Sequence, residues 1–425
     1  TDIAADDVLG TINFQAPDEG TGTDAILVAA GISAISEGDF SSSSNATKLV
    51  FKTGASAAAD SKFEIASDGS VSTPTAGTSN LRLGVNAGNS IASGGNFNVT
   101  VGDEAGTAIT TGDSNTLVGY AAGDAITTSG NNVAVGTSSM TTNILSAKNV
   151  ALGVNALKTH DQGTATESFN VAVGHNAAES LTTGTENTII GGEAGDAMTD
   201  ADRNTVVGYN ALTTNTKSDR NTAIGRSALE NLNHTSVTSG LNVAVGHGAG
   251  SLLTTGEKNT IIGSYSGNQD SLDIRTADSN IVLADGDGNT RLFYKTATLN
   301  WNIKVPAASN NALIVNNTGG SDEFGVQIVN STDRNDGTGH FISCVGSSTA
   351  RFKVFTNGNA VNSNNSYGSI SDEKLKENIV DSGSQWDDIK ALKVRKFSMK
   401  EDKLGAPNKI GVIAQELEAS GMNGL

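Results

Sequence analysis

A five-residue pattern of polar and apolar positions recurs through the middle of the chain. Each copy reads Asn, usually Thr or Val, a small or apolar residue, an aliphatic residue and Gly, and the eleven copies end at Gly84, Gly102, Gly119, Gly136, Gly153, Gly174, Gly191, Gly208, Gly225, Gly246 and Gly263. Successive glycines are 17 or 18 residues apart, except for two gaps of 21. So short and regular a period predicts a solenoid, in which each copy is one rung of a stack.

The positions within a rung predict two short strands and two turns. The residue before the rung Gly is Val, Ile or Leu in every copy, and the residue two before it is usually Thr or Val, so β-branched side chains line one face of a strand. The third residue after Gly is always Ala or Ser, which indicates a tight interior. An aliphatic residue often returns seven residues after Gly, and a Thr-Thr-Gly turn follows it in several rungs.

The repeated Asn has two interpretations. It either stacks in a ladder and adopts turn conformations that Asn tolerates, or it lines a sugar-binding face. We favour the structural interpretation because the Asn never varies while the turns around it do. The gaps of 21 place four extra residues near His160 to Ser168 and near Asn233 to Gly240. Insertions of this kind usually bulge from one face of a solenoid, often the binding face.

The predicted fold class is all-β, a trimeric β-solenoid with rungs of about 17 residues. Eleven rungs at ~4.8 Å spacing would form a rod on the order of 50 Å long. No proline occurs between Pro74 and Pro306, as expected for stacked strands that need every backbone N–H. The trimer is a hypothesis at this point: the line of small residues would be explained if three chains packed their rungs around one axis.

We divide the chain into four regions. Residues 1–79 form an N-terminal β-rich module, residues 80–267 the solenoid, residues 268–370 a distal β-rich module, and residues 371–425 a short α-helical segment. The N-terminal module ends in an alternating strand and an Asp-Gly turn over Phe63 to Val71, which predicts a hairpin, and a near copy returns at Phe352 to Val361.

Composition narrows the functional classes. Aromatic residues make up 4% of the 425 residues and Gly accounts for 50, which favours thin stacked rungs over a thick core. The net charge of −18 argues against a nucleic-acid partner, and without an apolar run of about 18 residues we expect no membrane insertion. Cys344 is the single cysteine, so the chain forms no internal disulfide. Because the sequence does not begin with Met, we expect it to be a fragment or a processed form of a longer protein.

The C-terminal segment carries two motifs in order. The first, Ser371-Asp372-Glu373-Lys374-Leu375-Lys376-Glu377-Asn378-Ile379, begins with a good helix N-cap, and the second is Ile410-Gly411-Val412-Ile413-Ala414-Gln415-Glu416-Leu417. Both resemble the intramolecular chaperone domain that ends many phage tail fibres and endosialidase tailspikes. Residues 385–392 and 413–419 also predict helices. The repeats and the strand before Asn357 are similar, more weakly, to the region upstream of this domain in marine phage fibres.

The resemblance implies a homotrimer whose C-terminal domain aligns the chains and is then removed by self-cleavage before a Ser. By the family's pattern Ser371 would be the nucleophile and Lys376 the base, which requires a Lys held neutral by burial or by its neighbours. On a regular helix two residues five apart point about 140° away from each other. A capping Ser and a solvated Lys therefore remain an open alternative.

Other candidate sites have structural interpretations that we prefer. Asp285 to Asn289 matches the first ligand positions of a calcium loop but lacks the later Gly and Glu, so a hairpin turn is the better interpretation. His175 and His247 follow rung glycines four rungs apart and share no metal site. We expect no cofactor and no metal. Four aromatic residues of the distal module are assigned to core packing rather than to sugar stacking: Tyr294, Trp301, Phe341 and Tyr367.

The sequence as a whole predicts a structural phage tail fibre, located in the virion tail, that mediates host attachment. The expected partners are two further copies of the chain, phage tail or adaptor proteins, and a bacterial surface glycan or protein receptor. We expect no substrate-directed activity beyond possible self-cleavage at Ser371. Two alternatives stay open: the head of a bacterial trimeric autotransporter-like adhesin, and a glycan-degrading tailspike, which would need paired carboxylates in a groove.

Overall fold

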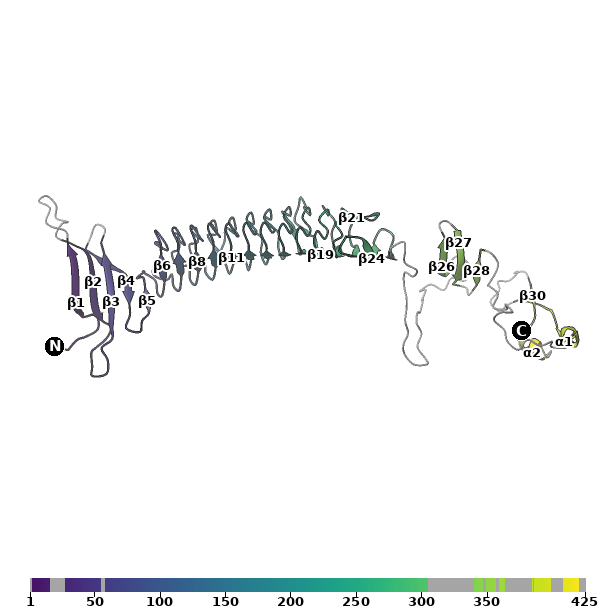
Figure 1. Cartoon of the computed structure of the whole chain (residues 1–425), viewed down its shortest axis with the longest axis horizontal. Coiled ribbons are helices and arrows are strands. Elements are labelled where there is room, and N and C mark those ends of the chain that lie inside the picture. Colours follow the sequence, from purple (N-terminus) through teal and green to yellow (C-terminus); the bar gives the residue numbers. More distant parts are fainter. Residues whose placement is uncertain are drawn as a thin grey trace. The chain divides into compact units, whose positions relative to one another are not determined.

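The computed structural model describes residues 2–15, 27–54, 58–304, 340–346, 349–356, 359–363, 384, 386–398 and 408–419. The chain divides into two compact units, residues 1–314 and 315–425. Figure 1 shows the rungs of the first unit stacked side by side, with their strands along one side of the stack. The prediction of an all-β solenoid with rungs of about 17 residues is confirmed.

The N-terminal region is a five-stranded antiparallel sheet in chain order, made of β1 (Val8–Gln15), β2 (Val28–Ser36), β3 (Thr47–Thr53), β4 (Asp60–Ile65) and β5 (Val71–Ser72). The predicted hairpin is its last turn, where Ala66 N donates to Ser70 O at 2.9 Å and Gly69 adopts a φ of 84°. Asp-Gly turns supply such positive φ values at little cost.

The solenoid is a stack of three-residue strands that pair in parallel and in register. The strands are β6 (Leu81–Leu83), β7 (Val99–Val101), β8 (Thr116–Val118), β9 (Val133–Val135), β11 (Val150–Leu152), β13 (Val171–Val173), β14 (Thr188–Ile190), β15 (Thr205–Val207), β17 (Thr222–Ile224), β19 (Val243–Val245), β20 (Thr260–Ile262) and β23 (Ile281–Ala284). The last of these extends the ladder one rung past the eleven glycine-ending copies. Ala284 stands there in place of the rung Gly.

A buried ladder of Asn side chains runs the length of the stack. In each link an Asn backbone N–H donates to the Oδ1 atom of the Asn one rung earlier, as from Asn204 to Asn187 at 2.9 Å. The Nδ2 atom of Asn187 also donates to Ala201 O at 2.8 Å, which closes the turn of its own rung. The members are Asn80, Asn98, Asn115, Asn132, Asn149, Asn170, Asn187, Asn204, Asn221, Asn242, Asn259 and Asn280. All are at most 5% exposed, and the structural interpretation is confirmed.

The rung glycines are required by backbone geometry. Gly208 has a φ of 142°, and a Cβ atom there would lie 2.4 Å from the carbonyl oxygen of Gly225, the equivalent residue of the next rung. L-residues rarely adopt this φ, and no flexible side chain is available to move aside. The same contact recurs at every rung from Gly84 to Gly246.

The prediction of two strands per rung is wrong for most rungs. Second strands occur next to the two insertions, where β10 (Ser146–Ala147) pairs with β12 (Thr166–Glu167) and β16 (Ser218–Asp219) pairs with β18 (Thr238–Ser239), and in a small antiparallel pair between β20 and β23. The remainder of each rung is turn, because three of its positions take a left-handed backbone, as Arg220, Ser227 and Leu229 do with φ between 52° and 58°. Left-handed residues cannot continue a strand.

The small residues three positions after the rung glycines lie inside the single chain, except for Ser266 after the last of them, which is half-buried. Ala194 and Ala211 are fully buried among the side chains of their own and neighbouring rungs. The line of alanines therefore does not require three chains around an axis, which removes the reason given above for a trimer without testing the trimer itself.

In several rungs the inward residue of the strand and the fourth residue after the rung Gly have complementary volumes. Where the inward residue of the strand is large, as Leu117 is, the fourth residue after the rung Gly is Gly123, and a Cβ there would lie 2.9 Å from a Leu117 methyl group. Where the inward residue is small, as Ala134 is, the equivalent position is Met140, which is fully buried. Close packing of this kind leaves neither a void nor an overlap.

A hairpin closes the C-terminal end of the stack. After β23 the chain turns back through β24 (Thr290–Lys295) and β25 (Asn300–Ile303), both antiparallel, and Thr296 N donates to Asn280 Oδ1 at 3.2 Å, which satisfies the last ladder side chain. Between β20 and β23 lies a small antiparallel pair, β21 (Asn268–Gln269) and β22 (Leu272–Asp273).

The second unit contains a three-stranded antiparallel sheet of β26 (His340–Gly346), β27 (Thr349–Phe355) and β28 (Ala360–Asn362), followed by α1 (Trp386–Ala391), β29 (Arg395–Phe397), β30 (Lys409–Gly411) and α2 (Ala414–Ala419). The two helices confirm the predictions for residues 385–392 and 413–419. The helix expected from Ser371 to Ile379 lies outside the described residues.

Asn187→Leu should lower the free energy of unfolding by about 3–5 kcal/mol. The substitution leaves the N–H of Asn204 and the carbonyl of Ala201 buried without a partner, at ~1–3 kcal/mol for each group. Denaturant unfolding of the variant measures the loss. The exposed turn variant Thr183→Ala should stay within ~0.5 kcal/mol of the wild type. Equal stability of the two variants would contradict a structural ladder.

Gly208→Ala should destabilise the protein by about 3 kcal/mol or more, since it combines a strained φ with a backbone overlap. Gly286→Ala is the matched control because nothing lies within 4 Å of the added methyl group and the φ is not positive. Thermal unfolding of both variants should separate them clearly. A Gly208 variant as stable as the control would show that the rungs are not spaced as described.

Candidate functional site

The outward face of the parallel sheet is the most regular surface of the solenoid. The first and third residues of every strand point away from the core, while the second residue is buried in most rungs. The third-residue column is aliphatic throughout, and its members include Leu83, Ile190, Ile224 and Ile262, which are 37–47% exposed. The first-residue column consists of Val and Thr apart from Leu81 and Ile281. No charged side chain occurs in either column.

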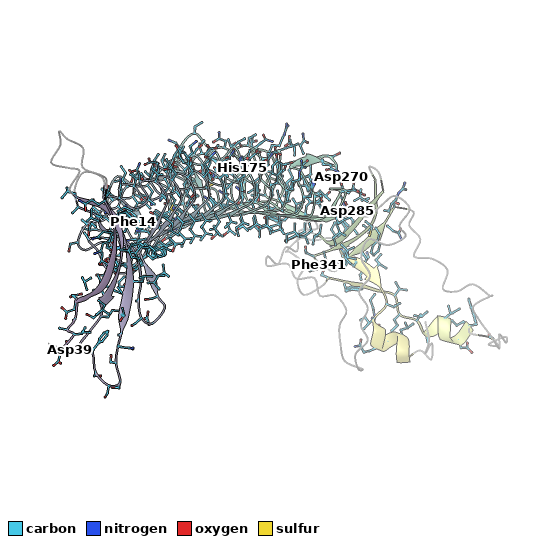
Figure 2. All side chains as sticks on the ribbon, turned by 60° about the vertical axis from the view of Figure 1, so that its left-hand side comes forward. Phe14, Asp39, His175, Asp270, Asp285 and Phe341 are labelled. Atoms are coloured by element: carbon cyan, nitrogen blue, oxygen red, sulfur yellow. The ribbon has the colours of Figure 1, made fainter. Side chains whose placement is uncertain are left out.

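A second surface is the corner that directly follows the rung glycines. On five consecutive rungs this position holds His175, Gly192, Tyr209, Arg226 and His247. The guanidinium of Arg226 lies 5.9 Å from the Tyr209 ring centre, and its Nη1 atom lies 3.4 Å from His247 Nε2. His175, labelled in Figure 2, lies in this column two rungs before Tyr209. His175 and His247 are four rungs apart in this column. Among the described residues, no group of three or more His, Cys, Asp and Glu side chains could hold a metal ion.

The second insertion borders an open hollow of about 400 Å³, lined by Thr214, Asn231, Asn233, Leu252, Thr254 and Arg275. Five of the six lining residues have polar side chains, and the charge of Arg275 is paired with Asp273 at 2.8 Å. No carboxyl group lines the hollow. It therefore does not offer the two carboxylates that glycoside hydrolysis uses.

The assignment of distal aromatic residues to a core is wrong for Trp301. Its side chain is 57% exposed on β25, and it meets Tyr294 of β24 with ring centres 5.4 Å apart. Phe341 on β26 is 36% exposed, and Tyr367 lies outside the described residues. The pair of rings sits on the closing hairpin, which has no further strand beyond β25 to bury them within the described sheet.

The loop from Asp285 to Asn289 is the turn of the β23–β24 hairpin. The hairpin turn was the interpretation preferred to a calcium loop. The Asp285 carboxylate accepts hydrogen bonds from the backbone N–H groups of Asp287 and Asn289 and pairs with Arg291. These contacts hold the pKa of Asp285 below its usual range despite an opposing effect of desolvation, which is the largest single influence. The Asp285 carboxylate therefore already has its hydrogen-bond partners within its own loop and on the neighbouring Arg291. Figure 2 labels Asp285 and Asp270 near this end of the solenoid.

His160 is a buried histidine that the sequence interpretation did not single out. It occupies the position seven residues after Gly153, which is aliphatic in many other rungs, and it is fully buried. Its Nε2 atom lies 3.4 Å from Asn170 Nδ2, while its Nδ1 atom has no partner. Burial lowers the pKa of His160 from its usual value near 6.5 to about 4, against a smaller opposing effect of Asp161. The imidazole is neutral at pH 7.

An ion pair joins β29 to α2 in the C-terminal segment. Arg395 of β29 donates two hydrogen bonds to the Glu416 carboxylate of α2, at 2.6 and 3.0 Å. Hydrogen bonding to Arg395 lowers the pKa of Glu416. Glu416 belongs to the second motif noted in the sequence, so this motif positions a helix against the β29–β30 pair. Ser371 and Lys376 lie outside the described residues, and the structure does not test their pairing.

Comparison with known proteins identifies this segment. Residues 371–423 match the family model of the chaperone of endosialidase. The matched residues begin at Ser371 and include both motifs, α1, β29, β30 and α2. No curated protein and no solved structure matches the chain. Among the described residues, no helix is long and apolar enough to cross a membrane.

The buried His160 predicts an acid-sensitive solenoid. Because the unfolded chain binds a proton near pH 6.5 and the folded chain only near pH 4, this residue's contribution to stability is complete above pH 6.5. It is lost as the pH falls towards 4, at about 1.4 kcal/mol per pH unit. Comparison of the free energies of unfolding at pH 7 and pH 5 should show a smaller difference for His160→Leu than for the wild type. The exposed control His247→Leu should keep the wild-type difference, and an unchanged difference in His160→Leu would contradict the assignment.

Proposed function

We propose that this protein is a structural fibre of a bacteriophage tail, located in the virion, that mediates attachment to the host cell. The observation that carries the proposal is the order of parts along one chain: a long solenoid followed by a chaperone segment of the endosialidase type. A solenoid presents an extended surface at a fixed spacing, which suits a spacer and a multivalent binder. A chaperone segment at the end of the same chain suits a shaft that must be assembled from several copies.

The proposed assembly is a homotrimer whose copies are aligned by the chaperone segment. Self-cleavage before Ser371, with Lys376 as the base, would then release the segment. The other proposed partners are phage tail or adaptor proteins at one end and a bacterial surface glycan or protein as receptor. For a glycan, the exposed Trp301 and the polar hollow near Asn233 are the surfaces that offer stacking and hydrogen bonding.

The chaperone match favours the tail fibre over the adhesin head, because the match concerns a phage-type assembly domain rather than a membrane anchor. A glycan-degrading tailspike shares the same chaperone type. Incubation with capsular polysaccharides distinguishes that alternative, since an enzyme generates new reducing ends and a binder does not.

The proposal predicts a native mass of three chains for the full chain in solution. If Ser371 is the nucleophile, the wild-type chain should be shortened at Ser371, as read from the mass of the denatured chain, and Ser371→Ala should remain intact. Lys376→Ala should also remain intact, while Lys374→Ala, a nearby lysine with no assigned role, should still be cut. A trimer of uncut wild-type chains would retain the fibre and exclude the peptidase, and a monomer would contradict the proposed assembly.

A further inference from the structure

The parallel sheet of the solenoid has one face without a partner. Its inward residues, such as Ile189, Val206 and Ala223, are fully buried in the core of the rungs. Its outward columns, described above, present Val, Ile, Leu and Thr over twelve consecutive strands. Parallel sheets are almost always covered on both faces, and contiguous exposed apolar patches larger than a few hundred Å² mark interaction sites.

The charge distribution separates this face from the rest of the solenoid. The chain carries a net charge of −18, yet no acidic or basic residue occupies an outward strand position from Leu81 to Leu283. Acidic side chains lie in the turns instead, where Glu179, Glu193 and Asp196 follow the strands β13 and β14. Copies of a strongly acidic chain repel each other wherever these turns meet, so the uncharged face is where association meets the least repulsion.

The spacing of the strands indicates what kind of molecule packs on this face. The aliphatic columns repeat once per rung, at about 4.8 Å, along the stack of twelve strands. A surface that matches this repeat over its whole length must have the same repeat, and another copy of this solenoid has it. Twelve strands of three residues present roughly 600 Å² of flat sheet per chain at these spacings. Three such faces around one axis would bury roughly 1,800 Å² in all, or roughly 600 Å² for each pair of chains, so the in-register match along the stack, and not area alone, supports the interface.

We propose that the outward face of the parallel sheet is the surface through which copies of this chain pack, side by side and in register, around the axis of the trimer. This inference rests on the proposed homotrimer and adds the residues that form it. Ile190 and Ile262, which are 39% and 47% exposed in the single chain, become buried in the assembly. The acidic turns then point away from the axis.

The test introduces two charges on the face. Ile190→Glu/Ile262→Glu in the full chain should reduce the native mass, measured by light scattering, from three chains to one. The matched control is Thr183→Glu/Thr255→Glu, which adds the same charge at two exposed turn positions, each nine residues after its rung Gly, and should remain a trimer. Circular dichroism of both variants checks that the strands are retained, as expected for outward substitutions.

The outcomes distinguish this inference from the proposed function. A monomeric wild type would refute the proposed trimer. A trimeric wild type whose Ile190→Glu/Ile262→Glu variant stays trimeric would retain the proposed function and overturn the interface, as would dissociation of the control variant.

Cross-linking gives a second readout that does not depend on tolerating a buried charge. In a Cys344→Ser background, Thr188→Cys and Ile190→Cys place a thiol in the first and third columns of the same strand. A short bismaleimide should join identical chains through at least one of these thiols and should leave the turn variant Thr183→Cys unjoined. A trimer that cross-links through neither strand position would overturn the interface.

Discussion

The hydrogen-bonded ladder of buried Asn side chains is the constraint on which the rest of the solenoid depends. Each ladder Asn from Asn98 onwards joins its rung to the previous one through its N–H, and most of them, like Asn187, also donate from Nδ2 to a carbonyl in the turn of their own rung. A three-residue strand supplies few backbone hydrogen bonds, so the side-chain ladder adds a second line of bonds parallel to the sheet. Since every amide atom in the ladder is buried, a rung can neither slip nor tilt without leaving polar groups unsatisfied.

The thinness of the rung follows from a second constraint, its left-handed backbone positions. Three left-handed positions per rung turn the chain so sharply that only one strand fits in most rungs. The interior then holds few side chains, and a large residue at one inward position accompanies a small residue at the other, as with Leu117 and Gly123 or with Met140 and Ala134. A core this narrow buries only one face of each strand. The aliphatic outward face is thus a direct consequence of the rung geometry.

Much of the fold could be predicted from the sequence because every rung of the solenoid repeats the same local structure. The period, the structural role of Asn and the need for Gly all follow from a pentapeptide that recurs eleven times. The twelfth rung was missed because Ala284 replaces the Gly, although Asn280 marks it. The second strand was over-predicted because left-handed residues such as Leu229 and Arg220 give no sequence signal: neither is a Gly or an Asn.

The candidate sites were less predictable, since they depend on what lies beside a residue in space. The exposure of Trp301 follows from its place on the last strand of the closing hairpin, and the neutral state of His160 follows from its burial within a rung. Neither fact is visible in the local sequence. The chaperone segment was recognisable because its two motifs are linear.

Native-state hydrogen exchange, read at single-residue resolution by mass spectrometry, tests the ladder most directly. The account predicts that the N–H groups of the ladder residues from Asn98 to Asn259 are among the slowest to exchange in the solenoid and that the N–H of exposed turn residues such as Thr255 exchanges faster. Ladder amides that exchange as fast as those turn amides would contradict the account.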